Sequence, residues 1–150
     1  MEMKLEKAIR QKGFQNEYQK AIINIIYTHN YLIGKMNPVF KQYGITRQQY
    51  NVLRILRGQH PDPATINLIK ERMLDKMSDA SRIAERLKKK KLIEKSRNLI
   101  DKRAADIIIS KKGLALLKTM DPESKKFNKL ITLSDGEVAN LNKILDNLRD

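Results

Sequence analysis

Residues 78–113, SDASRIAERLKKKKLIEKSRNLIDKRAADIIISKKG, determine the fold of this chain. Residues 78–91 are predicted to form a helix, because Ile83, Ala84 and Leu87 lie at the spacing of one helical face. The side chains around that apolar stripe are mostly charged, and four consecutive lysines end the segment. The pattern therefore predicts a helix with one apolar face and one strongly basic face.

The second part of the same stretch predicts two β-strands, over 92–97 and 104–109. In the later strand Ala105, Ile107 and Ile109 fall on one face, which is the period-two pattern of a strand. A two-stranded hairpin is only marginally stable alone in water. We therefore expect this hairpin to pack on the helices as a wing.

Helix-start signals predict two further helices before the basic one. Thr46 and Gln49 form the Thr-x-x-Gln pattern of a capping box, and the helix that they begin ends near Gly58. Another helix is predicted over 65–73. A helix, a short turn and a basic helix in this order are typical of a helix-turn-helix unit. Any helical hairpin can show the same pattern, and the predicted β-hairpin that follows distinguishes the winged form.

Prolines mark two expected interruptions in the remaining helices. A helix over 17–36 should end where Asn37 and Pro38 provide an N-cap and a first helical residue for a new helix. Ser110 should cap the helix after the hairpin, and Pro122 should break or kink that helix.

Positive charge is concentrated in the middle of the 150-residue chain. The net charge is +14, and residues 70–103 hold thirteen basic and six acidic side chains, whereas residues 104–150 hold eight and seven. A basic segment beside a balanced one is typical of a phosphate-binding element. A lysine-rich solvated helix is the alternative.

Composition excludes several classes of function. The chain has no cysteine, so disulfides, thiolate nucleophiles and cysteine-based zinc sites are excluded. No apolar run approaches the roughly 18 residues of a membrane span, and we expect a cytoplasmic protein. The sequence has no glycine-rich phosphate loop, nucleophile elbow or metal-ligand cluster, so we expect neither an enzyme nor a bound metal or cofactor.

Residues 45–117 resemble the MarR family of bacterial winged-helix transcription regulators. The similarity is strongest in 82–95, RIAERLKKKKLIEK, and it continues from Asp101 to Gly113. That second segment resembles the family's wing signature of Asp-x-Arg, five residues, Leu-Thr, two residues and Gly. The resemblance implies a mainly α, dimeric winged helix-turn-helix protein with a wing of two or three strands.

Two departures from the family pattern have a physical meaning. Lys91 stands where the family usually has a left-handed, helix-ending glycine, and it would cost about 1 kcal/mol if the backbone is unchanged. Ser110 replaces the usual Thr and keeps the capping hydroxyl. Members that sense peroxides use a cysteine, so thiol sensing is excluded for this chain.

The winged-helix interpretation predicts which residues contact double-stranded DNA. Arg82 could read guanine or clamp a phosphate, while Asp79 could accept from cytosine or cap the helix. Ser78 and Ser81 could equally be cap and turn residues. The full set of candidates is Lys76, Ser78, Asp79, Ser81, Arg82, Arg86, Arg97, Lys102 and Arg103.

The resemblance further implies that Asp101 and Arg103 shape the wing, and an ion pair between them is the alternative role for Arg103. One or two of the lysines over 88–91 should lie near phosphate. In the wing, arginine would reach a narrow minor groove.

Pseudo-palindromic DNA sites require a two-fold dimer. We expect residues 1–36 and 114–150 to form a helical dimerisation part, with 45–113 as the DNA-binding part of a single chain over 1–150. The apolar dimerisation candidates could instead belong to the core of one subunit. They are Ile22, Leu141, Ile144, Leu145 and Leu148.

Family members often bind a small aromatic or anionic ligand between these two parts. Tyr27, His29, Tyr31 and Tyr50 are candidates for such a pocket, although a Tyr at helical spacing is more often a core residue. The leading hypothesis is a homodimeric, sequence-specific DNA-binding repressor released by such a ligand. A sequence-indifferent nucleoid-type protein and a winged helix that binds proteins are the alternatives.

Overall fold

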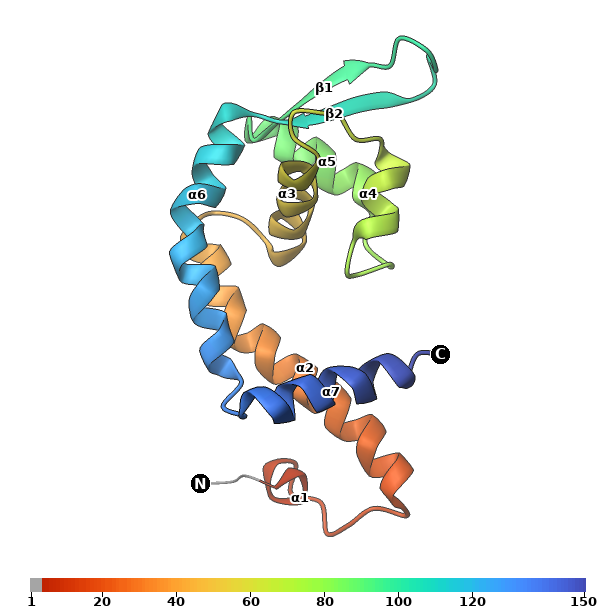
Figure 1. Ribbon diagram of the computed structural model, residues 1–150, viewed down its shortest axis with the longest axis vertical. Coiled ribbons are helices and arrows are strands. Elements are labelled where there is room, and N and C mark those ends of the chain that lie inside the picture. Colours follow the sequence, from red (N-terminus) through yellow and green to blue (C-terminus); the bar gives the residue numbers. More distant parts are fainter. Residues whose placement is uncertain (1–3) are drawn as a thin grey trace.

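Seven α-helices, one 3₁₀ turn and one β-hairpin form the part of the chain that the structure, a computed structural model, describes, residues 4–150 (Figure 1). Residues 1–3, which begin the expected dimerisation segment, lie outside the described residues. The elements are α1 (Leu5–Ala8), α2 (Glu17–Gln42), α3 (Arg47–Gln59), α4 (Ile66–Arg72), α5 (Ala80–Lys89), β1 (Ile93–Arg97), β2 (Ala105–Ile109), α6 (Lys111–Lys126), η1 (Phe127–Leu130) and α7 (Asp135–Asn147). The predicted mainly α fold with a small sheet is confirmed.

The predicted capping residues begin their helices. Gln49 donates its backbone N–H to Thr46 Oγ1 at 3.1 Å, and Thr46 donates its own N–H to Gln49 Oε1 at 3.1 Å, which completes the capping box of α3. Thr65 caps α4. The helix expected from residue 78 starts at Ala80 instead, because Asp79 rather than Ser78 is the N-cap.

The hairpin pairs β1 with β2 in antiparallel register, from Ile93 opposite Ile109 to Arg97 opposite Ala105. Ile107 is fully buried on the inner face of β2. Ala64 forms one isolated bridge with Ile107, so the third strand of the wing is reduced to a single pair. The buried face of β2 attaches the hairpin to the helices, as a marginal two-stranded unit requires.

Pro38 does not begin a new helix, which corrects the expected boundary. It lies inside α2, which continues to Gln42. The proline ring removes one backbone hydrogen bond, to the carbonyl of Gly34, but Gly34 and Pro38 are both exposed and water can solvate that carbonyl. Phe40 follows and is almost fully buried against Tyr50 and Phe127, with ring centroids 4.9 and 5.7 Å away. This packing holds the last turn in the helix.

Pro122 likewise lies inside α6, so the helix break that was one of its two expected effects does not occur. Met120 is buried on the turn before it. Arg57 Nη1 donates to both carboxylate oxygens of Asp121, each at 3.0 Å, which ties this part of α6 to α3. Tertiary contacts therefore keep the helix continuous despite the missing backbone donor.

One apolar core joins α3, α4, α5 and the hairpin to the end of α2 and to α6. It reaches beyond residues 45–113, since Phe40, Leu117 and Met120 belong to it. In Figure 1 the hairpin projects at one end of the molecule, whereas α1, α7 and the start of α2 lie at the other. The largest fully buried side chains of this apolar core are Phe40, Val52, Leu53, Leu56, Ile69, Leu87, Ile107, Leu117 and Met120.

A tight junction connects both ends of the hairpin to the start of α6. Ser110 caps α6 by accepting from Gly113 N at 3.0 Å, and its hydroxyl donates to the Lys91 carbonyl at 2.8 Å. The backbone N–H of Ser110 donates to the Leu92 carbonyl at 3.0 Å. A Cβ atom on Gly113 would lie 2.3 Å from that carbonyl oxygen and 2.7 Å from Ile109 Cγ1. Position 113 therefore has to be glycine for α6 to approach so closely.

Gly113→Ala should lower the free energy of unfolding by about 1–3 kcal/mol, because the added methyl group would push α6 away from the Leu92 carbonyl and separate the groups at this junction. Gly58→Ala is the matched control, since Gly58 lies on the exposed side of α3 with no atom within 4 Å of an added Cβ. That change should stabilise the protein by up to about 1 kcal/mol through helix propensity. Urea denaturation measures both, and equal effects of the two substitutions would contradict the close approach.

Candidate nucleic-acid interface

The face of α5 that points away from the core is basic and unpaired. Ala84 and Leu87 are buried on its inner side, whereas Arg82 and Arg86 are exposed one turn apart on its outer side. Within residues 4–150 neither arginine forms an ion pair. Ser81, beside them, is exposed as well. Both guanidinium groups are therefore available to an anionic partner.

The turn before α5 contains three of the candidate DNA contacts, and two of them have internal partners. Asp79 Oδ1 accepts from the backbone N–H of Arg82 at 3.1 Å, so its carboxylate caps the helix. Lys76 Nζ donates to the backbone carbonyls of Glu71 and Lys70 at the end of α4. A cation at that position opposes the negative end of the α4 dipole. Ser78 is half-buried and is not the cap.

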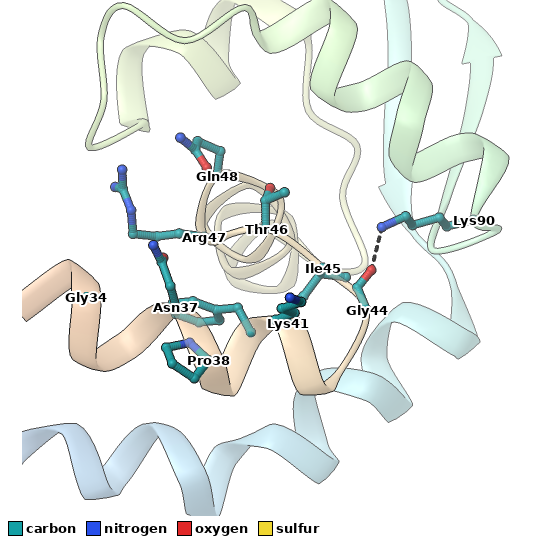
Figure 2. Close-up of a pocket in the computed structure, with 11 residues that line it drawn as sticks. Gly34, Asn37, Pro38, Lys41, Gly44, Ile45, Thr46, Arg47, Gln48 and Lys90 are labelled. Carbon is teal, nitrogen blue, oxygen red and sulfur yellow. Dashed lines mark hydrogen bonds between the residues drawn. The ribbon is translucent and has the colours of Figure 1, made fainter.

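The lysines at the end of α5 have different roles. Lys88 and Lys89 are exposed, but Lys90 Nζ donates to the carbonyl of Gly44 (Figure 2). Lys90 Nζ also donates to Gln49 Oε1, at 3.0 Å. Lys90 therefore fastens the end of α5 to the turn between α2 and α3. Sequence spacing could not identify this role, because Lys90 and Gly44 are 46 residues apart.

Lys91 adopts the left-handed conformation that its alignment with a family glycine implied, with φ of 59°. Its N–H donates to the Lys88 carbonyl at 2.9 Å, and the N–H of Leu92 donates to the Leu87 carbonyl at 3.0 Å. This pair of bonds is a Schellman motif, which ends the helix and is usually built with glycine. The turn delivers the chain directly from α5 into the hairpin.

Hydrogen bonds from side chains to backbone shape the outer turn of the hairpin. Asn98 Oδ1 accepts from the N–H groups of Ile100 and Asp101 at 2.9 and 2.8 Å, and Asn98 Nδ2 donates to Asp106 Oδ1 at 2.8 Å. Asp101 Oδ1 accepts from Arg103 N at 3.0 Å. No ion pair joins the side chains of Asp101 and Arg103 within residues 4–150. Asn98 was not selected from the sequence, although an Asn that begins a turn is the available signal.

An ion pair fixes the base of the hairpin to α5. Lys95 Nζ donates to Glu85 Oε1 at 2.7 Å, and this ammonium holds the pKa of the Glu85 carboxyl below its usual value. The wing candidates Arg97, Lys102 and Arg103 are all exposed on the same hairpin. The structure therefore places all the candidate cations except Lys76 on two connected elements, α5 and the wing.

A separate cavity of about 780 Å³ lies between α2, α3 and the turn before α5. Of the four residues predicted for a ligand pocket, His29 and Tyr50 line this cavity, whereas Tyr27 and Tyr31 are not among its lining residues and are exposed. Arg47 and Arg54 in its wall were not predicted from the sequence, because they stand singly along one helix without a motif. The lining residues are His29, Leu32, Ile33, Met36, Phe40, Arg47, Tyr50, Asn51, Arg54, Leu74 and Asp75.

The walls of this cavity connect to the turn that precedes α5. Asn51 Oδ1 accepts from the Leu74 backbone N–H at 3.0 Å, and Arg54 Nη1 donates to the Tyr50 hydroxyl at 3.1 Å. Arg47 also borders a second hollow of about 770 Å³, where Figure 2 draws it with Lys41 and Lys90. Two arginines and an apolar floor suit an aromatic or anionic molecule better than a cation.

Residues 4–150 contain no group of three or more His, Asp or Glu side chains arranged to hold a metal ion. No helix among them is both long enough and apolar enough to cross a bilayer.

Residues 35–120 match the family model described as transcriptional regulator SarA/Rot. The HTH-type transcriptional regulator MgrA of Staphylococcus aureus is 30% identical over 109 residues, which cover 73% of each chain. These matches identify regulators of transcription rather than enzymes, in agreement with the sequence-based expectation.

Solved structures share the fold. A MarR transcription factor from Planctomyces limnophilus is 25% identical, with a TM-score of 0.69 over 89% of this chain and 98% of that one. BpsR of Bordetella bronchiseptica, whose DNA binding is regulated by 6-hydroxynicotinic acid, is 20% identical with a TM-score of 0.66 over 85% and 99%. The chain belongs to the SarA/Rot family of DNA-binding transcriptional regulators and has the winged-helix fold of the MarR-type regulators.

Proposed function

We propose that this protein is a repressor that binds a pseudo-palindromic operator as a homodimer and reads its sequence with α5. The observation that carries this proposal is the pair of exposed, unpaired arginines, Arg82 and Arg86, on a helix whose other face is buried. A helix held in this way can enter a major groove with its first turns against base edges. Because the target is chromosomal DNA, we expect the protein to act in the cytoplasm.

The connection between α5 and the wing supports binding across two neighbouring grooves. The Schellman turn at Lys91 and the Lys95–Glu85 ion pair fix the hairpin relative to α5. With α5 in a major groove, Arg97, Lys102 and Arg103 would reach the adjacent minor groove and its phosphates. A sequence-indifferent nucleoid-type protein could use the same surface, so sequence preference has to be measured directly.

Arg82→Ala should weaken binding to the preferred operator by about 1–3 kcal/mol per half-site and weaken binding to random duplex far less. The operator is first selected from a random duplex pool, and both affinities are titrated at one stated salt concentration. Lys118→Ala removes the same charge from an exposed position on α6 and should change neither affinity.

Equal losses on operator and random DNA would assign Arg82 to a phosphate rather than a base. Failure of the pool to yield any preferred sequence would replace the operator-binding proposal by the nucleoid-type function. The selected sites should contain two half-sites about one helical turn apart, or a multiple of it.

Homodimerisation is supported by apolar side chains that one subunit leaves uncovered. No residue of α7 is buried. Ile144 and Leu148 are 56% and 63% exposed, and Ile22 on α2 is 61% exposed, while Leu141 and Leu145 are half-buried. These residues lie on the elements at the end of the molecule opposite the wing (Figure 1). Large apolar side chains left exposed on a helix are typical of residues that an obligate interface covers.

Ile144→Lys together with Leu148→Lys should convert a dimer into a monomer, because two charges would be buried in an apolar interface. Sedimentation equilibrium measures the mass against the 17.5 kDa of one chain. Ala139→Lys, at an exposed position on the opposite side of α7, is the control and should leave the dimer intact. A wild-type monomer, or a double variant that stays dimeric, would contradict the assignment.

A small aromatic acid is the proposed releasing ligand, bound in the 780 Å³ cavity between α2 and α3. Arg47 and Arg54 would pair with its carboxylate, and the apolar wall would cover its ring. The Asn51–Leu74 hydrogen bond gives the cavity a direct contact with the turn before α5. The regulation of BpsR by an aromatic acid supports this choice of ligand class.

6-Hydroxynicotinate should raise the melting temperature of the protein and weaken its binding to the operator. Arg54→Gln should reduce both responses while the unliganded protein still binds operator, since Arg54 lies in the cavity and not on α5. Differential scanning fluorimetry and titration of a labelled operator measure the two effects. An unchanged response in the variant, or none in the wild type, would contradict this ligand class at this cavity.

A further inference from the structure

The outer turn of the wing exposes two large apolar side chains. Leu99 is 94% exposed and Ile100 is 98% exposed, more than any other large apolar residue described in the chain. They lie in the loop at the free end of the hairpin, away from the apolar core (Figure 1). Adjacent apolar residues displayed in this way are unfavourable in water and indicate a contact made with a partner.

The turn that carries this pair is hydrogen-bonded at several points. Asn98 Oδ1 accepts from the N–H of Ile100, and the Asn98 N–H donates to the Ala104 carbonyl at 3.2 Å. The Ala104 N–H donates to the Asp101 carbonyl at 3.0 Å. These bonds fix the backbone on both sides of the pair. The two side chains are therefore held outward by the turn.

The charges around the pair favour nucleic acid as the partner. Arg97, Lys102 and Arg103 are exposed beside it, and none of them forms an ion pair within residues 4–150. A minor groove presents the matching pattern, with a row of phosphates on each side of sugars and base edges. An anionic membrane would also attract these cations, but the hairpin is fixed to the helix that carries Arg82 and Arg86.

We propose that Leu99 and Ile100 enter the minor groove beside each half-site and wedge apart a base step, which bends the operator. This inference rests on the proposed operator binding and adds a source of sequence preference at a position without base hydrogen bonds. Apolar side chains inserted between base steps partly unstack them and kink the duplex. Pyrimidine–purine steps such as TA and CA/TG unstack most easily, so they should be enriched at the flanks of selected operators.

Substitution of both residues, Leu99→Ser with Ile100→Ser, tests the wedge in the full-length protein. Operator affinity should fall about tenfold, the bend measured by energy transfer between the duplex ends should decrease, and the dependence on salt should stay unchanged. Lys102→Ser is the matched control from the same loop. It should lower the slope of log K against log salt by about 0.9 per lost phosphate contact and leave the bend in place.

The outcomes separate this inference from operator binding itself. A double variant that binds and bends the operator like the wild type overturns the wedge, while operator binding stands. A wild-type protein that selects no operator overturns both. Loss of binding to phosphatidylserine vesicles, with DNA binding and bending intact, would assign the pair to a membrane surface and overturn the wedge. Both residues are almost fully exposed, so an unchanged melting temperature verifies that the variant folds.

Discussion

The close approach of α6 to the backbone at Leu92 is the constraint on which the rest of the structure depends. Only glycine at position 113 allows it, because any Cβ there would overlap the Leu92 carbonyl and Ile109. Ser110 then joins the two ends of the hairpin, because its hydroxyl donates to the Lys91 carbonyl and its N–H donates to the Leu92 carbonyl. The same hydroxyl accepts from Gly113 N at the start of α6. The hairpin is thus held at its base, and only its outer turn extends from the molecule.

The basic residues of the chain are divided between structural roles and recognition. Lys90 secures the end of α5 to the turn at Gly44, and Lys95 secures the hairpin to Glu85. Lys76 satisfies carbonyls at the end of α4. The net charge of +14 therefore overstates the number of cations free to meet phosphate. Arg82 and Arg86 have no ion-pair partner in the described chain, and other side chains fix their helix.

Helix starts, the basic helix and the hairpin could be predicted because their signals are local. A cap and its partner lie three residues apart, as Thr46 and Gln49 do, and a strand shows its pattern over five residues. The two proline predictions failed for the opposite reason. Pro38 and Pro122 would interrupt an isolated helix, but distant packing, of Phe40 in particular, keeps the helices continuous.

The basic helix and the two strands of the hairpin could be predicted from the sequence, since they follow from spacing within a few residues, and the family was indicated by the resemblance of residues 45–117. Only the tertiary structure decided the internal role of Lys90, the arginines around the cavity and the exposure of Leu99 and Ile100. Burial and pairing depend on groups far apart in the chain, and a lysine or a leucine has the same local signal whether it is paired, covered or free.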